Sequence, residues 1–307
     1  MGVEFEYVTE LGDKAENQDV CRIQQFPWGT ICAVFDGHGR NGFHVAHFAS
    51  KQLMKYLDEI ITEVLKSNKP LIEDETTLLN KLIEGIQNAF ERTSKDVDNG
   101  VVAVSKDDDG KSSESTQNHL DIHLSGTTAC IIGVVEGKVS DVENETEKFL
   151  FSGSLGDTKA VLCVTGKDNH WKAVTLTTDH ICSNEEERKR VEEKGGNIRR
   201  IRTLNNDSQE LEHEQGPLRL YNGTLPYPGL VVTRAFGDLD GRSIGVISVP
   251  EIDFYKLTTN DHAIIVASDG LWDSITPKVA AKMLTKYFFF SFLFWSNFLY
   301  HSYSILK

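Results

Sequence analysis

The sequence predicts an α+β fold in which two β-sheets pack face to face and helices cover them. Seven runs have the composition of strands, and several are apolar almost throughout, which is typical of strands buried between two layers. Long amphipathic segments separate some of these runs, but strands and helices do not alternate strictly, so a sandwich is favoured over a βαβ sheet. The strand-like runs are 30–35, 127–135, 148–152, 160–165, 171–176, 230–233 and 262–267.

Three helices are predicted. Two are amphipathic, with apolar residues recurring on one face over 45–64 and 78–90. The third, at 185–194, begins after Asn184, a favoured N-cap residue, and ends at a pair of glycines.

Two polar segments are expected to be surface insertions. Residues 95–117 are rich in Asp, Ser, Gly and Lys, which predicts a mobile loop without a chemical role. Residues 204–215 are polar and acidic. Composition alone indicates a solvated loop there.

Composition limits the classes of partner. The chain has 307 residues, of which 39% are hydrophobic and 25% charged, as in soluble globular proteins. Its net charge of −14 argues against nucleic acid and anionic membranes as partners, and suits cations and basic substrate segments. A monomer with one main domain over residues 1–286, followed by an atypical tail at 287–307, is expected.

The cysteines indicate a reducing compartment. They are five in number with no Cys-x-x-Cys spacing, and three of them lie in apolar strand-like runs. No signal-peptide pattern is seen at the N-terminus. A cytoplasmic or nuclear location is therefore expected.

Two Asp-Gly corners carry the chemical information. Asp36-Gly37-His38-Gly39 follows the apolar run 30–35, and Asp269-Gly270 follows the run 262–267. A strand fixes the carboxylate at its end, and glycine allows a backbone carbonyl to approach an ion. Two such corners are expected to converge on hard cations, for which oxygen ligands favour Mg²⁺ or Mn²⁺.

Eight short motifs occur in the order found in the metal-dependent protein phosphatases of type 2C, and from about residue 7 to about residue 281 the chain resembles that family. The motifs are Lys14-Ala15-Glu16-Asn17-Gln18-Asp19, Asp36-Gly37-His38-Gly39, Ser125-Gly126-Thr127-Thr128-Ala129, Gly156-Asp157-Thr158-Lys159-Ala160, Thr178-Asp179-His180, Gly195-Gly196, Thr233-Arg234-Ala235-Phe236-Gly237-Asp238 and Asp269-Gly270-Leu271-Trp272-Asp273.

The resemblance implies an α/β/β/α four-layer sandwich of two antiparallel sheets flanked by helices. It also implies that residues 204–215 form a flap beside the active site, with a solvated loop without a role as the alternative. It further implies a signalling enzyme that dephosphorylates phosphoserine and phosphothreonine in proteins. The reaction would use two Mg²⁺ or Mn²⁺ ions, with a weaker third, and a metal-activated water that attacks phosphorus directly.

The resemblance also assigns roles in the metal shell. Asp36 would bridge the two ions, Gly37 would lend its carbonyl oxygen to one and Asp269 would bind the other. Asp19 would complete the acidic shell. Two further aspartates match positions of the third ion, although turn or cap roles remain open for both: Asp157 and Asp273.

Four other residues receive expected roles from the motifs. His38 would be the general acid that protonates the leaving oxygen. Lys14 would hold the substrate phosphate as a point charge. Arg234 and Asp238 are expected to be structural and to pair with each other across a turn.

The C-terminal segment departs from the family pattern. The family closes its metal site with an aspartate in an Asp-Asn pair on a later strand, whereas no Asp or Glu follows Asp273 here. A catalytically impaired pseudophosphatase, or a phosphoprotein-binding scaffold of the same fold, is the alternative function.

The tail is unusually aromatic. Residues 287–303 hold ten of the 28 aromatic residues, with neither a helical nor a strand period. The favoured interpretation is a non-native end that packs poorly; a membrane anchor and an ordinary buried strand or helix are the alternatives.

Overall fold

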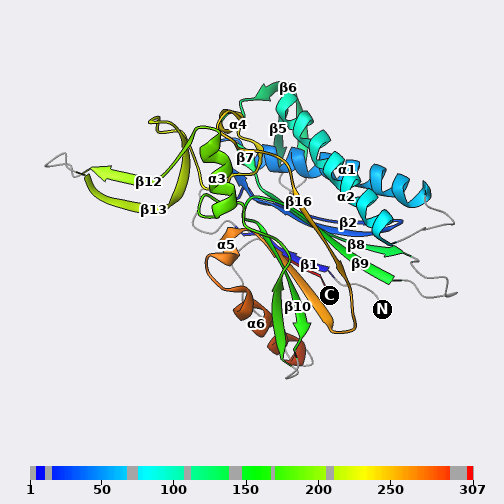
Figure 1. Cartoon of the computed structure of the whole chain (residues 1–307). Coiled ribbons are helices and arrows are strands. Elements are labelled where there is room, and N and C mark those ends of the chain that lie inside the picture. The colour runs from blue at the N-terminus through cyan, green and yellow to red at the C-terminus, as the bar shows by residue number, and fades with distance from the viewer. Residues whose placement is uncertain are drawn as a thin grey trace.

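Four layers make up the fold (Figure 1): α1 (Gly42–Ser67) and α2 (Glu75–Asn99), two five-stranded sheets, and α5 (Asp269–Trp272) with α6 (Pro277–Phe290). The predicted α+β class is confirmed. The computed structural model describes residues 5–10, 16–67, 75–106, 112–137, 147–166, 170–204, 211–290 and 303–306.

Both main sheets are antiparallel and combine strands from distant parts of the chain. The first has the order β16 (Glu251–Lys256), β9 (Glu147–Leu155), β8 (Ala129–Gly137), β3 (Gly29–Phe35) and β2 (Val20–Phe26). The second has the order β1 (Phe5–Val8), β18 (Tyr303–Leu306), β17 (Asp261–Ala267), β10 (Lys159–Thr165) and β11 (Trp171–Thr175).

Strand β3 shows why the central runs are apolar throughout. Ile31 and Phe35 pack in the core beneath α1 and α2, whereas Cys32 and Val34 pack between the two sheets against Leu162 and other residues of the second sheet. Since successive side chains of a strand point to opposite faces, a strand buried on both faces must be apolar at every position.

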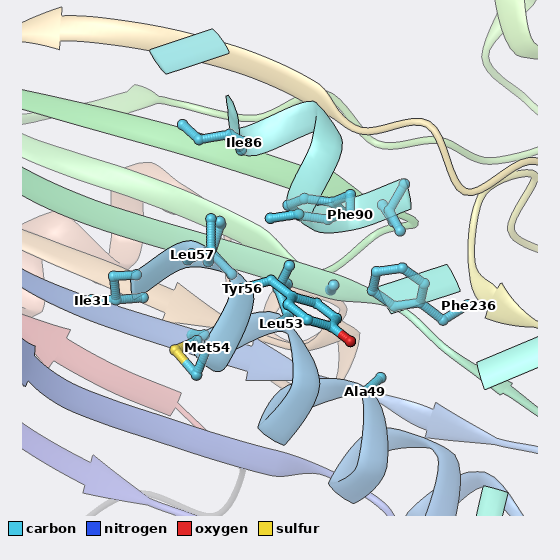
Figure 2. Close-up of a cluster of buried hydrophobic side chains, with 14 of the residues drawn as sticks. Ile31, Ala49, Leu53, Met54, Tyr56, Leu57, Ile86, Phe90 and Phe236 are labelled. Atoms are coloured by element: carbon cyan, nitrogen blue, oxygen red, sulfur yellow. The ribbon is translucent and has the colours of Figure 1, made fainter. Parts of the chain in front are cut away.

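The amphipathic faces of α1 and α2 meet over the first sheet, as their periodicity predicts. Leu53 and Leu57 of α1 lie beside Ile86 and Phe90 of α2 in one buried cluster (Figure 2), and all four are 0% exposed. The rings of Phe90 and Phe236 stack with their centroids 5.6 Å apart. The cluster thus anchors the segment that carries Phe236.

Helix α3 (Glu185–Glu193) begins as its cap residue predicts. The side chain of Asn184 accepts hydrogen bonds from the backbone N–H groups of Glu186 and Glu187. The helix leads into a three-stranded sheet of β12 (Gly196–Leu204), β13 (Leu211–Asn222) and β14 (Pro228–Leu230). Strands β12 and β13 extend away from the sandwich (Figure 1).

A small three-stranded sheet sits at the end of the sandwich that carries the functional motifs. It consists of β15 (Phe236–Gly237), β7 (Gly126–Thr127) and β4 (Gly37–His38) in that order. The short helix α4 (Leu239–Arg242) follows β15.

Two local predictions were wrong. Part of 95–117 is ordered: α2 continues to Asn99, and a hairpin of β5 (Val101–Lys106) and β6 (Ser112–Leu120) follows. Val101 is fully buried in the α1–α2 core, so tertiary packing holds a segment whose composition is that of a loop. Residues 230–233 are not a strand: only Leu230 belongs to β14, while Val232 forms an isolated bridge to Ile181.

The structure describes part of the segment that was predicted to be a tail. Helix α6 continues through the boundary placed at residue 286, and Tyr303–Leu306 pairs as β18 with both β1 and β17. The backbone of β18 therefore occupies an interior position in the second sheet, where both of its edges are hydrogen-bonded. No helix within the described ranges is both long and apolar enough to cross a membrane.

Candidate active site

Asp36 lies where β3 leaves the core. The residue is 8% exposed, its backbone N–H donates to the Thr128 hydroxyl (3.1 Å), and its carbonyl accepts from the Thr128 N–H (2.9 Å). The Thr128 hydroxyl also lies 2.5 Å from that of Thr158, which directly follows Asp157. A chain of hydrogen bonds thus links the first Asp-Gly corner to the turn that carries Asp157.

Gly37 must be glycine for a reason of packing. A Cβ at this position would lie 2.5 Å from the carbonyl oxygen of Gly42 and 2.6 Å from that of Gln18. The sequence prediction explained the glycine by approach to an ion; in the structure, two backbone carbonyls already demand it.

The second corner meets the N-terminal acidic motif. Asp269 is the first residue of α5, and Ser268 precedes it. The Ser268 hydroxyl donates to Oδ2 of Asp19 (2.9 Å), although the two residues are 249 positions apart. The structure therefore brings Asp19 to the corner that carries Asp269.

Three of the predicted acidic residues interact electrostatically. Burial, and secondly the charge of Asp269, raise the pKa of Asp157 to about 7. Burial and Asp269 also raise the pKa of Asp273. Both shifts are those expected of carboxyl groups that are partly removed from water and lie near another carboxylate.

One cation among these carboxylates was not predicted. Nζ of Lys159 forms an ion pair with Oδ2 of Asp179 at 2.8 Å, and Lys159 partly offsets the upward shift of the Asp273 pKa. Lys159 begins β10, and Asp179 lies in the loop after β11.

The donor set fits a hard cation in its chemistry. The predicted ligands are oxygen atoms, and the raised pKa of Asp157 beside Asp269 indicates an acidic pair that a divalent ion would neutralise. In the described part of the chain, no three His, Cys, Asp or Glu side chains already form a group that could hold a metal. The carboxylates are therefore gathered at one end but not closed around a centre. Lys14, the expected phosphate ligand, lies outside the described residues.

His38 lies beside this acidic group and has a partner that the sequence analysis missed. Its Nε2 is 2.6 Å from Oδ2 of Asp238, a residue that is 0% exposed, whereas the His38 side chain is 27% exposed. Burial alone would lower the pKa of His38, but Asp238, with smaller contributions from Asp157 and Asp269, raises it. The contact with Asp238 therefore favours the protonated form of the ring.

The expected pairing of Asp238 with Arg234 is wrong. Arg234 instead donates to the Glu187 carboxylate, with the shortest contact from Nη2 to Oε1 at 2.6 Å. The two charged residues of this motif therefore have different partners: Arg234 pairs with Glu187 of α3, and Asp238, which follows β15, pairs with His38. Local spacing gave no signal of this, because His38 and Asp238 are 200 residues apart.

Comparison with known proteins identifies the family. The protein phosphatase 2C family model matches residues 24–287. Probable protein phosphatase 2C 61 of Arabidopsis thaliana is 30% identical over 279 residues, which is 90% of this chain and 70% of that protein. Probable protein phosphatase 2C 48 of Oryza sativa subsp. japonica is 29% identical over 283 residues, covering 89% and 70%.

Solved structures share the fold. The serine-threonine phosphatase 2C from Toxoplasma gondii superposes with a TM-score of 0.65 at 16% identity, covering 99% of this chain and 93% of that one. A sex determining protein of C. elegans gives a TM-score of 0.59 at 20% identity, covering 99% and 64%. With the family model matching most of its length, this chain belongs to the protein phosphatase 2C family.

Proposed function

We propose that the protein is a Mg²⁺- or Mn²⁺-dependent phosphatase that removes phosphate from serine and threonine residues of proteins. The observation that carries this proposal is the meeting of distant acidic motifs beside His38. Asp157 and Asp269 both act on the His38 pKa, and Asp19 is hydrogen-bonded to Ser268 at the same corner.

The metal ligands in this proposal are those of the two Asp-Gly corners. Asp36 would bridge two ions, with the Gly37 carbonyl on one, Asp269 on the other and Asp19 completing the shell. Asp157 and Asp273 would hold a weaker third ion. When bound, the ions supply a water acidic enough to act as a nucleophile at neutral pH.

The protein's own residues handle substrate and proton. His38 would give its proton to the serine or threonine oxygen as the bond to phosphorus breaks, so that a poor leaving group departs as a neutral hydroxyl. Lys14 would hold the phosphate. The net charge of −14 favours substrates in which basic residues flank the phosphorylated site.

One observation favours a second candidate, a pseudophosphatase or phosphoprotein-binding scaffold. Strand β18 is next to β17, the strand that leads to Asp269, yet its residues Tyr-Ser-Ile-Leu include no carboxylate. A site short of one carboxylate would bind one ion weakly. Such a protein would retain the fold and bind phosphoproteins without turning them over.

A reducing compartment, cytoplasmic or nuclear, and a monomeric state are also proposed. Four of the five cysteines are buried: Cys32, Cys130, Cys163 and Cys182. Burial raises the pKa of Cys163 and Cys182 to about 12, which suits inert core thiols. Fractionation of cells producing the tagged protein and sedimentation velocity would test these two assignments.

The decisive experiment on function compares wild type with Asp36→Asn. With a phosphothreonine peptide and Mn²⁺, wild-type turnover is expected to depend on the metal. Asp36→Asn should reduce it to background, because both ions lose their shared ligand. Calorimetric titration with Mn²⁺ should show weakened binding in the same variant.

Asp253→Asn is the matched control, since Asp253 is an exposed carboxylate in β16 outside this site. It should leave turnover and Mn²⁺ binding unchanged. Full turnover in Asp36→Asn would refute the metal assignment. A wild type that binds the phosphopeptide without hydrolysing it at any Mn²⁺ concentration would establish the scaffold instead.

A further inference from the structure

The contact between His38 and Asp238 joins two segments that lie at the same end of the molecule. Asp238 is 0% exposed, and its Oδ2 lies 2.6 Å from Nε2 of His38. We propose that Asp238 is a positioning residue for the reaction: it fixes the orientation of the His38 ring and leaves Nδ1 as the nitrogen that serves the substrate. This inference rests on the proposed function of His38 as general acid.

Asp238 occupies a backbone conformation that ordinary side chains avoid. Its φ of 51° and ψ of 50° are left-handed, and it is the only non-glycine residue with positive φ in the described part of the chain. Such a conformation persists only where the surroundings enforce it, and it is common at functional sites. Here it aims a buried carboxylate at His38.

The usual structural roles for an aspartate at this position are not fulfilled. Asp238 stands at the N-cap of α4, yet its side chain makes no capping hydrogen bond. Nor does it bind Arg234, which is bonded to Glu187. Its Oδ1 is buried without a hydrogen-bond partner among the described residues, so the carboxylate directs its side-chain hydrogen bond to His38. The charge of Arg242 also interacts with Asp238, but no hydrogen bond joins the two within the described residues.

The small three-stranded sheet is built around this contact. Gly126 of β7 pairs with His38 on one side and with Gly237 on the other. A Cβ at Gly126 would lie 2.2 Å from Oδ2 of Asp238, so only glycine leaves room for the carboxylate. The Asp238 N–H also donates to the Ser125 carbonyl at 3.0 Å, which holds the residue in place.

The proposed proton transfer depends on which ring nitrogen of His38 is hydrogen-bonded to Asp238. Nε2–H donates to Asp238, and within the described residues no hydrogen bond to Nδ1 is seen. When the bond from phosphorus to the leaving oxygen breaks, that oxygen takes the proton from Nδ1. The ring is left neutral, with Nε2–H still bonded to Asp238. A charged acceptor behind the ring stabilises the imidazolium and fixes the tautomer that remains.

Asp238→Asn tests this assignment with little disturbance of the backbone, because asparagine tolerates the left-handed conformation. Turnover of a phosphoserine peptide should fall by roughly 10- to 100-fold, a part of the 10²–10⁴-fold that general acid catalysis contributes. Turnover of p-nitrophenyl phosphate should change little, since its leaving group hardly needs a proton. Thermal unfolding and Mn²⁺ binding should stay near wild type.

Two further measurements separate positioning from general stability. In His38→Gln, adding Asp238→Asn should cause no further loss of peptide turnover, because a residue that acts through His38 has no effect without it. In NMR spectra of the ¹⁵N-labelled wild type at fixed pH, the proton on Nε2 of His38 is expected to resonate downfield. Asp238→Asn should abolish that signal.

Asp240→Asn is the matched control. Asp240 also bonds a histidine, Nδ1 of His123 at 2.8 Å, but on the surface, where the His123 side chain is 60% exposed. The Asp240→Asn variant should change the turnover of neither the phosphoserine peptide nor p-nitrophenyl phosphate.

Unchanged peptide turnover in Asp238→Asn, or equal losses on both substrates, would overturn the proposal. If the wild type hydrolyses no phosphopeptide, the proposed function fails. The downfield signal of the His38 Nε2 proton still tests the contact between His38 and Asp238. Its absence in wild type, or its persistence in Asp238→Asn, also overturns the inference.

Discussion

Buried charges in this protein are kept where a distant residue supplies the opposite charge. Asp238 is paired with His38, and Glu187 with Arg234. Removing Glu187 would leave the Arg234 side chain without its carboxylate partner, which is destabilising at a buried site. His38 is 27% exposed, so solvent can compensate its charge and a neutral isostere at Asp238 is expected to cost much less.

Glu187 provides a prediction at this scale. Burial alone would raise its pKa, but hydrogen bonds from Arg234, Arg190 and Thr233 outweigh burial and lower it to about 2. Relative to the ordinary value of 4.5, this shift corresponds to about 3 kcal/mol of stability at neutral pH. Glu187→Gln should therefore lower the free energy of unfolding by about that amount at pH 7.

The pH dependence of this effect has a definite sign. Because the folded-state pKa is the lower one, the stabilisation is complete above about pH 4.5 and is lost as the pH falls towards 2. Urea unfolding at pH 7, 4 and 2.5 should show the difference between wild type and Glu187→Gln shrinking. Glu192→Gln, which removes an exposed ion pair of the same helix, should change stability by less than about 1 kcal/mol. A pH-independent difference for Glu187→Gln would contradict this account.

Among the elements, β18 changes how the C-terminal segment is understood. The aromatic segment lacks the period of a strand, and a buried strand or helix was only an alternative interpretation. In the structure its last residues pair with β1 on one side and β17 on the other. Without β18, both neighbours would present unpaired backbone groups, and exposed strand edges promote aggregation. The strand therefore protects the second sheet.

Ser304→Pro tests this position. Ser304 is opposite Tyr7 in β1 and Val266 in β17, so proline would remove a backbone N–H from the interior of a sheet. We expect the free energy of unfolding to fall by about 3 kcal/mol or more, as for proline inside a helix, with increased aggregation. Ser304→Ala keeps the N–H and should behave as wild type. Equal urea midpoints for the two variants would show that β18 lies outside the sheet.

At the scale of the whole molecule, the candidate site is made where strands of both sheets end. Asp36 follows β3 of the first sheet and Asp269 follows β17 of the second. Helices α1 and α2 hold one sheet while α5 and α6 cover the other, so the spacing of the acidic residues depends on how the four layers pack (Figure 1).

This geometry predicts how metal binding can be strengthened. Tyr303, the first residue of β18, is opposite Ala267, two residues before Asp269. The double substitution Tyr303→Asp with Ser304→Asn adds the Asp-Asn pair that the family pattern implies. It should tighten Mn²⁺ binding by about 10-fold or more, as measured by calorimetry. The uncharged pair Tyr303→Asn with Ser304→Asn is the control, and equal affinities in the two proteins would contradict the expected position of the ligand.

Local physical chemistry was enough to predict the α+β class, most of the core strands, the two amphipathic helices and the cap at Asn184. Alternation in strands, a period of 3.6 in helices and the hydrogen-bonding capacity of a cap are properties of neighbouring residues. The Asp-Gly corners were visible for the same reason, since a strand end and a glycine lie within a few positions of each other.

Only the tertiary structure decided which charges meet. Asp238 bonds His38 rather than Arg234, Arg234 bonds Glu187, and Ser268 bonds Asp19 across 249 residues. The interior position of β18 likewise depends on two strands from opposite ends of the chain. These contacts join residues with no spacing in common, so no local pattern encodes them; the packing of two sheets creates them by bringing their strand ends together.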